Sequence, residues 1–290
     1  MKKWSALTSI LLLLLIACAA WISLSLSGNP GAPLKAPLLP YQWLAVAALL
    51  VAVCMVAGIL VNGRIDGILI DDRNRISLVR LQWVAWLVVL LSGYYAGAVL
   101  NAAAGAADLP EMQADLFALL GIVNGSAVVS GLIVDNKKSA PPSSPPPRPQ
   151  PGQPGQIGSM DCNATPDEAS WADLYCGDEV ANRDVVDISR LQKLVMTILL
   201  LMTYVQMLWM AFGKAAAAGQ FTQMPEVGTT FLGLLGASNA AYLAYKATPK
   251  TPMPADPEMA GDGPARPLPP PAPPTAPPPR PAVAVARARS

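Results

Sequence analysis

The sequence predicts an all-α membrane protein with about six transmembrane helices, and its composition is the first observation behind this. Hydrophobic residues make up 53% of the 290 residues and charged residues only 13%, whereas soluble globular chains average about 25% charged residues. The second observation is apolar stretches near the length of about 20 residues that a ~30 Å hydrocarbon layer requires. Six occur, with no charge in their central portions: 5–27, 42–62, 82–103, 115–134, 192–213 and 227–245. The last is the weakest because glycine, serine and asparagine dilute it.

Proline separates the apolar spans from two low-complexity tracts. Of the 30 prolines, eight lie in 139–158 and fifteen in 247–290. Such tracts cannot bury enough apolar surface to offset the entropy of ordering them. We expect a disordered linker and a disordered tail, rich in polyproline II conformation and able to dock on a partner.

These boundaries divide the chain into seven expected regions. They are a signal anchor (1–27), a second span (28–62), a first two-span unit (63–138), a Pro-rich linker (139–159), an acidic segment (160–183), a second two-span unit (184–246) and a Pro-rich tail (247–290).

Lysine and arginine predict the orientation, because cytoplasmic loops carry the excess of positive charge. With the N-terminus inside and six crossings, eighteen basic residues fall inside and only Lys35 and Lys214 outside. Both termini, the linker and the acidic segment are then cytoplasmic. We expect a multi-pass protein of the bacterial inner membrane.

The first span has alternative interpretations. The sequence around Cys18 resembles a bacterial lipoprotein signal, in which this cysteine would be lipidated, and it also suits an ordinary signal peptidase. Apolar character continues through Leu26, which favours an uncleaved signal anchor.

The segment from Asp161 to Arg190 has a net charge of −6. We expect one short helix there, capped near Thr165 or Asp167, and no independent domain, because about 30 residues cannot form a self-sufficient core. Its Cys162 and Cys176 make a poor zinc site without further ligands, and cytoplasmic cysteines are reduced.

An internal repeat covers the two two-span units. Arg-Leu-Gln recurs at 80–82 and 190–192, Pro-Glu at 110–111 and 225–226, and Leu-Leu-Gly at 119–121 and 234–236; Asn124 matches Asn239. The second copy is five residues longer between its Gln and its Pro. Each unit contributes an even number of spans, so the two copies are predicted to lie parallel.

The repeat supplies the candidate interface and packing residues. The arginines can snorkel to lipid phosphates, the glutamines can hydrogen-bond to a neighbouring helix, the Pro-Glu pairs begin the return helices, and the asparagines seek interhelical partners. Asp184 or Asp187 can cap the fifth span. Glycines at GxxxG spacing allow close helix contact. The candidates are Arg80, Gln82, Arg190, Gln192, Glu111, Glu226, Asn124, Asn239, Gly93, Gly97, Gly121 and Gly125.

The doubled pattern of SRLQ, span, PE and LLGxSxAxYLxxK resembles a group of bacterial membrane proteins with no assigned activity. The resemblance covers 63–134 and 175–246, and its most specific part is LYCGDEVANRDVVDISRLQ at 174–192. The first copy departs from it, since Val79 stands where the second has Ser189. The resemblance implies a topology and no activity.

Composition and motifs disfavour an enzyme. The chain has no histidine, no nucleotide-binding glycine loop and no metal-spaced ligand cluster, so no cofactor and no metal are expected, and net charge +1 indicates no nucleic-acid partner. The sequence favours a non-enzymatic membrane anchor or scaffold that presents Pro-rich segments or the acidic segment to a protein partner. The alternative is a passive channel or transporter-like pore formed when two-span repeats assemble into a homo-oligomer.

Overall fold

The computed structural model describes residues 39–106, 108–139 and 155–250. These all belong to one compact unit that ends at Met253. The first predicted span, most of the predicted linker and nearly all of the predicted tail lie outside the described residues. Within them the chain is mostly helical.

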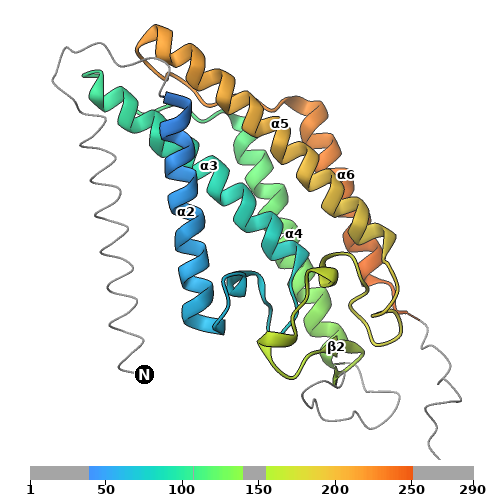
Figure 1. Cartoon of the computed structure of the whole chain (residues 1–290). Coiled ribbons are helices and arrows are strands. Elements are labelled where there is room, and N and C mark those ends of the chain that lie inside the picture. Colours follow the sequence, from blue (N-terminus) through green and yellow to red (C-terminus); the bar gives the residue numbers. More distant parts are fainter. Residues whose placement is uncertain (1–38, 107, 140–154, 251–290) are drawn as a thin grey trace, which may run out of the picture. The chain divides into compact units, whose positions relative to one another are not determined.

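Five α-helices account for the predicted spans from the second to the sixth (Figure 1). They are α2 (Leu39–Asn62), α3 (Leu78–Ala103), α4 (Ala114–Ser139), α5 (Ile188–Ala218) and α6 (Gly228–Ala247). Of the helices described, α2, α3, α4 and α5 are long and apolar enough to cross a membrane. The weakest predicted span became α6, which is not among these four. The predicted membrane-protein class is therefore supported by four helices.

Short elements form the connections at one end of the helices. A 3₁₀ turn, η2 (Gly67–Leu69), follows α2, and an antiparallel pair, β1 (Gly155–Ile157) and β2 (Met160–Cys162), follows α4. The predicted linker thus ends in a strand. Two 3₁₀ turns, η3 (Pro166–Glu168) and η4 (Trp171–Leu174), replace the single short helix expected after Cys162.

Capping explains why two short 3₁₀ turns form where one helix was expected. Thr165 occupies the N-cap of η3 but makes no side-chain cap bond. Ser170 instead caps η4, and the carboxylate of Asp173 accepts a hydrogen bond from the Ser170 backbone N–H in return. A reciprocal capping box satisfies two backbone donors, so η4 begins as a separate turn at Ser170 and does not continue from η3.

The helices pack around an aromatic core. Helix α3 contacts α2, α4 and α5, whereas α6 contacts α4 and α5. Trp86 of α3 is fully buried, with its ring centroid 5.9 Å from those of Tyr204 in α5 and Phe231 in α6. Phe212 and Phe221 stack with their centroids 4.5 Å apart. Large rings therefore fill the space between the helices.

The loops that join α3 to α4 and α5 to α6 are hydrogen-bonded to each other. The Glu111 N–H donates to the Thr222 carbonyl, and the Met224 N–H donates to the Glu111 carbonyl, both at 2.9 Å. The Asp115 carboxylate accepts from the Val227 and Gly228 N–H groups at 2.6 and 3.0 Å. An acid in the first turn of α4 thus caps α6.

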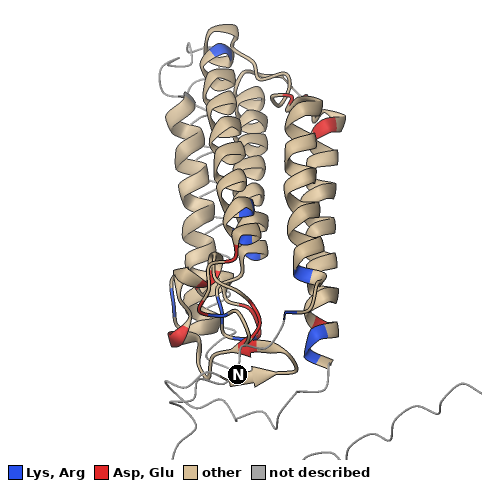
Figure 2. Ribbon diagram, turned by 90° about the vertical axis from the view of Figure 1, so that its right-hand side faces the viewer, with Lys and Arg blue, Asp and Glu red and all other residues tan. Residues whose placement is uncertain are grey.

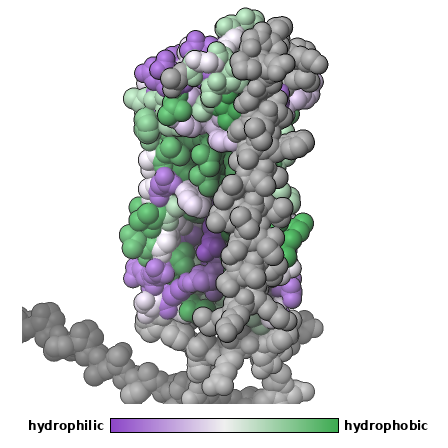
Figure 3. Space-filling view, turned by 90° about the vertical axis from the view of Figure 1, so that its left-hand side faces the viewer, coloured by the Kyte–Doolittle hydropathy of each residue, from purple (hydrophilic) through white to green (hydrophobic). Residues whose placement is uncertain are grey.

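Most charged residues gather at the end of the helices opposite these two loops, where the short elements lie (Figure 2). We call it the charged end. It comprises loop 63–77, the segment 155–187 and the last turns of α4 and α6. In Figure 3, hydrophobic side chains dominate the middle of the visible face, and hydrophilic ones lie mainly toward its two ends. This is the distribution expected where helices cross from water through hydrocarbon.

Candidate functional site

The charged end is organised around one buried carboxylate, Asp178. Its Oδ1 lies 3.1 Å from Arg73 Nη2, and its Oδ2 lies 3.2 Å from Lys246 Nζ. Arg190 forms a third ion pair with the same carboxylate. Burial alone would raise the pKa of Asp178, but the charges of Arg190, Lys246 and Arg73 hold that pKa well below its ordinary value. Asp178 therefore joins loop 63–77, α5 and α6 as a charged group.

A second cluster, around Arg75, ties loop 63–77 to the acidic segment. Arg75 lies 2.9 Å from Asp161 Oδ2 and 3.0 Å from Asp173 Oδ1. Asp173 also accepts from the Ile76 N–H at 3.1 Å. Because these partners come from η4 and β2, two arginines of the first unit, Arg73 and Arg75, neutralise much of the segment whose net charge is −6.

Nearby cations neutralise the carboxylate of Asp161 less fully than that of Asp178. Burial raises the pKa of Asp161 above its ordinary value, although Arg75 and Arg183 oppose the shift. Its Oδ1 has no hydrogen-bond partner among the described residues, and Arg183 Nη1 lies 3.7 Å away. Two carboxylates of one segment are thus shifted in opposite directions by the number and proximity of their cations.

Glu179 brings together the points where both Pro-rich tracts begin. Its Oε1 pairs with Lys137 Nζ at 2.6 Å, and its Oε2 accepts from the Lys250 N–H at 3.3 Å. Lys137 Nζ also donates to the Thr248 carbonyl at 3.2 Å, and the Ser159 N–H donates to the Lys137 carbonyl at 3.1 Å. Both ends of the linker and the start of the tail are therefore held at one place.

Lys193 is a buried cation that the sequence did not single out. Its side chain is fully buried in α5, and Nζ has no hydrogen-bond partner among the described residues. The ammonium lies 4.2 Å from the ring centroid of Tyr242, a cation–π contact. Lys193 directly follows the repeated Arg-Leu-Gln, and this position was the sequence signal that could have identified it. The matched position in the first unit is Trp83, so comparison of the two copies did not.

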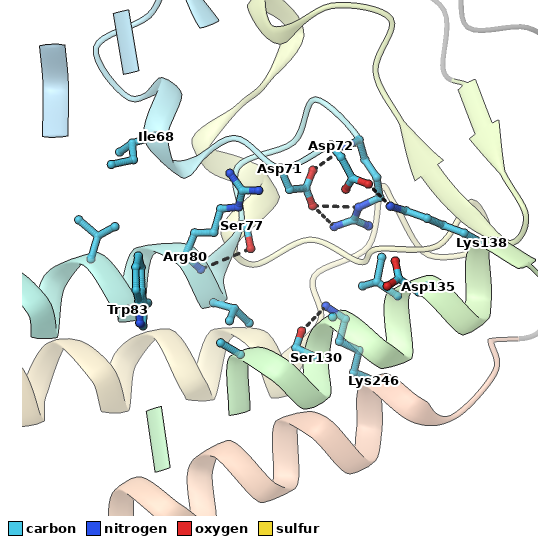
Figure 4. A pocket seen from close by; sticks show the side chains of 16 residues that line it. Ile68, Asp71, Asp72, Ser77, Arg80, Trp83, Ser130, Asp135, Lys138 and Lys246 are labelled. Carbon is cyan, nitrogen blue, oxygen red and sulfur yellow. Dashed lines mark hydrogen bonds and ion pairs between the residues drawn. The ribbon is translucent and has the colours of Figure 1, made fainter. Parts of the chain in front are cut away.

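A groove of about 450 Å³ lies beside this network, between the first turns of α3 and the last turns of α4 (Figure 4). Apolar side chains, including Val79, Val84 and Ala127, line part of it, and charged side chains line the rest. Asp71 pairs with Arg73, and Asp72 pairs with Lys138. The groove is amphipathic.

The two predicted arginines, Arg190 and Arg80, lie in different environments. Arg190 is 3% exposed, pairs with Asp178 and donates to the carbonyls of Asp173 and Leu174. Arg80 is exposed and lines the groove, where Nη1 donates to the Ile70 carbonyl at 2.7 Å. The expectation of lipid contact is therefore wrong for Arg190, because buried carbonyl and carboxylate oxygens surround it.

The matched glutamines and asparagines diverge as well. Gln82 is buried with neither amide atom hydrogen-bonded among the described residues, whereas Gln192 is exposed. Asn124 is exposed and accepts from Trp83 Nε1 at 2.6 Å, whereas Asn239 is buried and donates to the Leu235 carbonyl of its own helix. Only Asn124 thus makes the expected interhelical bond.

Of the four candidate glycines, the two in α3 make close contacts with described residues. A Cβ on Gly93 would lie 3.1 Å from Leu208, and one on Gly97 would lie 2.6 Å from Phe221. A Cβ on Gly121 or Gly125 would meet no described residue within 4 Å. The predicted packing role therefore holds for Gly93 and Gly97, while the α4 pair lies on an exposed face.

Glu111 and Glu226 precede α4 and α6, which begin at Ala114 and Gly228, so the Pro-Glu pairs do not begin these helices as expected. Glu111 belongs to the bridge between the loops, which requires extended backbone there. The candidate lipidation position Cys18 lies outside the described residues. Within the described residues, Cys162 and Cys176 are both free thiols.

The arrangement can hold loops rigidly by charge and can offer the groove to an amphipathic molecule. Comparison of the chain with protein-family models, with curated proteins and with solved structures gave no match.

Proposed function

We propose that the chain is a non-enzymatic membrane anchor that displays its two Pro-rich tracts side by side to a protein partner. The observation that carries the proposal is the convergence on Glu179, whose two carboxylate oxygens contact Lys137, just before the linker, and Lys250, just before the tail. Two low-affinity peptide segments that start at one point bind a partner with two sites more tightly than either segment alone, because the second contact becomes intramolecular.

The buried ion pairs support this role. The Pro-rich tracts depart from a surface held by Asp178, Arg73 and Arg190, and not from independent loops. Ordering the starting points of two arms lowers the entropic cost of engaging both. The polyproline II character expected for PPPRP at 145–149 and PLPPPAPP at 267–274 suits aromatic-lined grooves of a partner.

We further propose the full topology of six spans, two parallel two-helix units and cytoplasmic termini in a bacterial inner membrane. The eighteen-to-two distribution of basic residues and the matched motifs support it. Helix α5, with 31 residues, exceeds α3, with 26, by the same five residues that separate the two copies in sequence. Reporter fusions after Lys250 and after Ala106 should report the inside and the outside, respectively; the opposite result would invert the topology.

The anchor function is tested by crosslinking in native membranes followed by recovery of bound proteins. Four forms are compared: the full chain, a deletion of 251–290, a replacement of 140–154 by a Gly/Ser segment of equal length, and both changes together. Each single change should lower recovery of the same partner about tenfold or more, if both arms act together, while membrane insertion persists. The matched control is Lys214→Gln, an exposed change outside the charged end. Unchanged recovery from the doubly altered form would refute the proposal.

A further inference from the structure

Within the described part of the chain, the groove beside α3 contains one charge of each sign that has no ion-pair partner. Among the described residues Arg80 has no carboxylate partner, and the Asp135 carboxylate has no cation partner, although both are exposed and line the groove. The other acids on its wall, Asp71 and Asp72, are neutralised by Arg73 and Lys138. The free charges therefore suit a molecule that carries one negative and one positive group.

The position of the groove indicates what kind of molecule reaches it. It is formed by helices α3 and α4, both long and apolar enough to cross a membrane, where they meet the charged end. Trp83 lines it, is 44% exposed and is oriented by its bond to Asn124. A partly exposed tryptophan at a span end is typical of the membrane–water interface. The groove is thus open to the headgroup region of the bilayer.

We propose that this groove binds a phospholipid whose headgroup carries a phosphate and a primary ammonium. The phosphate would contact Arg80, whose guanidinium has five N–H donors and uses one of them on the Ile70 carbonyl. The ammonium would contact Asp135, since a carboxylate accepts N–H hydrogen bonds from a primary ammonium. An acyl chain would lie along the apolar side chains, Val79, Trp83 and Val84 among them.

Figure 4 shows the arrangement that this requires: Arg80 and Trp83 lie on the α3 side of the groove, and Asp135 and Lys138 lie on the α4 side. A purely anionic lipid would gain contact with Arg80 but would bring no cation to Asp135, the acid on the groove wall that no described cation neutralises, which disfavours it. A quaternary ammonium carries no N–H donor for Asp135. The inference is independent of the partner-docking function, because it involves neither Pro-rich tract.

Native mass spectrometry of the detergent-solubilised full chain tests this inference. The probes are phosphatidylethanolamine, phosphatidylglycerol and phosphatidylcholine with identical acyl chains. We expect phosphatidylethanolamine to be retained about tenfold more than the other two. Arg80→Gln should lower its retention about tenfold, the effect of losing a charge-assisted hydrogen bond. Asp135→Asn should remove the preference for phosphatidylethanolamine over phosphatidylglycerol.

Two controls keep the test decisive. Lys214→Gln removes an exposed cation outside the groove and should leave retention unchanged, and the unfolding midpoint of each variant shows whether the fold is intact. Equal retention by wild type and a folded Arg80→Gln variant would overturn the proposal. Equal or stronger binding of phosphatidylglycerol by the wild type, or displacement of the lipid by inorganic phosphate, would also overturn it.

Discussion

The two-helix units α3–α4 and α5–α6 share a sequence pattern but differ in where its polar residues lie. Arg80 is exposed beside a groove, whereas Arg190 is buried in ion pairs. Gln82 is buried with no hydrogen-bond partner in the part of the chain that the structure describes, whereas Gln192 is exposed. The motif Arg-Leu-Gln therefore marks the first turn of a helix. It does not predict whether the arginine or the glutamine faces the interior.

The helix N-caps show the same divergence on a smaller scale. Asp187 accepts from the backbone N–H groups of Ser189 and Arg190 at 2.9 and 3.2 Å, and the matched Ser77 accepts from that of Arg80 at 3.5 Å. The acidic segment lies directly before α5 in sequence, so its charges gather around the start of α5. In the first unit this position faces the groove. What surrounds a repeat thus determines what its residues do.

The largest expected effect tests whether the two arginines really differ. Arg190→Ala should lower the free energy of unfolding by about 3–5 kcal/mol, because it removes one partner of a buried pair. Arg80→Ala should change it by about 0.5 kcal/mol or less, as for most surface substitutions. Denaturant unfolding in mixed micelles, followed by helicity, measures both. Similar losses at the two positions would contradict the comparison.

Acid should act on the second unit through Asp178. Because the pKa of Asp178 is lowered in the folded protein, its contribution to stability is present above the unfolded value of about 3.9 and is lost as the pH falls through the folded value. Asp178→Asn should therefore be less stable than wild type at neutral pH, and the difference should shrink below about pH 4.

As a control, the contribution of Asp161 to the free energy of unfolding should change with pH in the opposite direction. Its folded pKa is raised, so its effect on stability improves as the pH falls through that raised value toward about 3.9. Asp161→Asn should remove this gain. Unfolding free energies measured across the acid range separate the two variants, and parallel curves for both would show that the cations around Asp178 do not lower its pKa.

The smallest expected effect is a difference in unfolding free energy between variants of the two matched glutamines. Gln82→Leu should raise the free energy of unfolding by about 1 kcal/mol, because it removes a buried amide with no hydrogen-bond partner among the described residues. Gln192→Leu, at the exposed matched position, should change it by less than about 0.5 kcal/mol. Both are measured in the same micelles. A destabilised Gln82→Leu variant would indicate that an internal water satisfies the amide.

Much of the helical architecture could be predicted because it depends on local sequence. Helices α2 to α5 cover the predicted spans from the second to the fifth, since about 20 apolar residues in succession favour a spanning helix. Asp187 caps α5 as one of the two predicted candidates. The start of α4 was misplaced because Pro110-Glu111 also suits a helix N-terminus, and the bridge to the other loop was not visible in sequence.

The candidate site was less predictable because its partners are distant in sequence. Arg73 and Asp178 are separated by 105 positions, and Lys137 and Glu179 by 42. Charge counting showed that the acidic segment needed cations, but many basic residues were predicted on the same side. Which of them pair depends on how loop 63–77 and the segment 155–187 fold together.

By itself the sequence determined the apolar spans, the concentration of basic residues at alternate span ends and the paired motifs at the helix entrances. Only the tertiary structure decided that Arg190 is buried, that Arg80 borders a groove and that Glu179 holds the starts of both Pro-rich tracts together. The physical reason is that hydropathy and capping are properties of neighbouring residues. Burial and ion pairing depend on which distant side chains remove water from the same place.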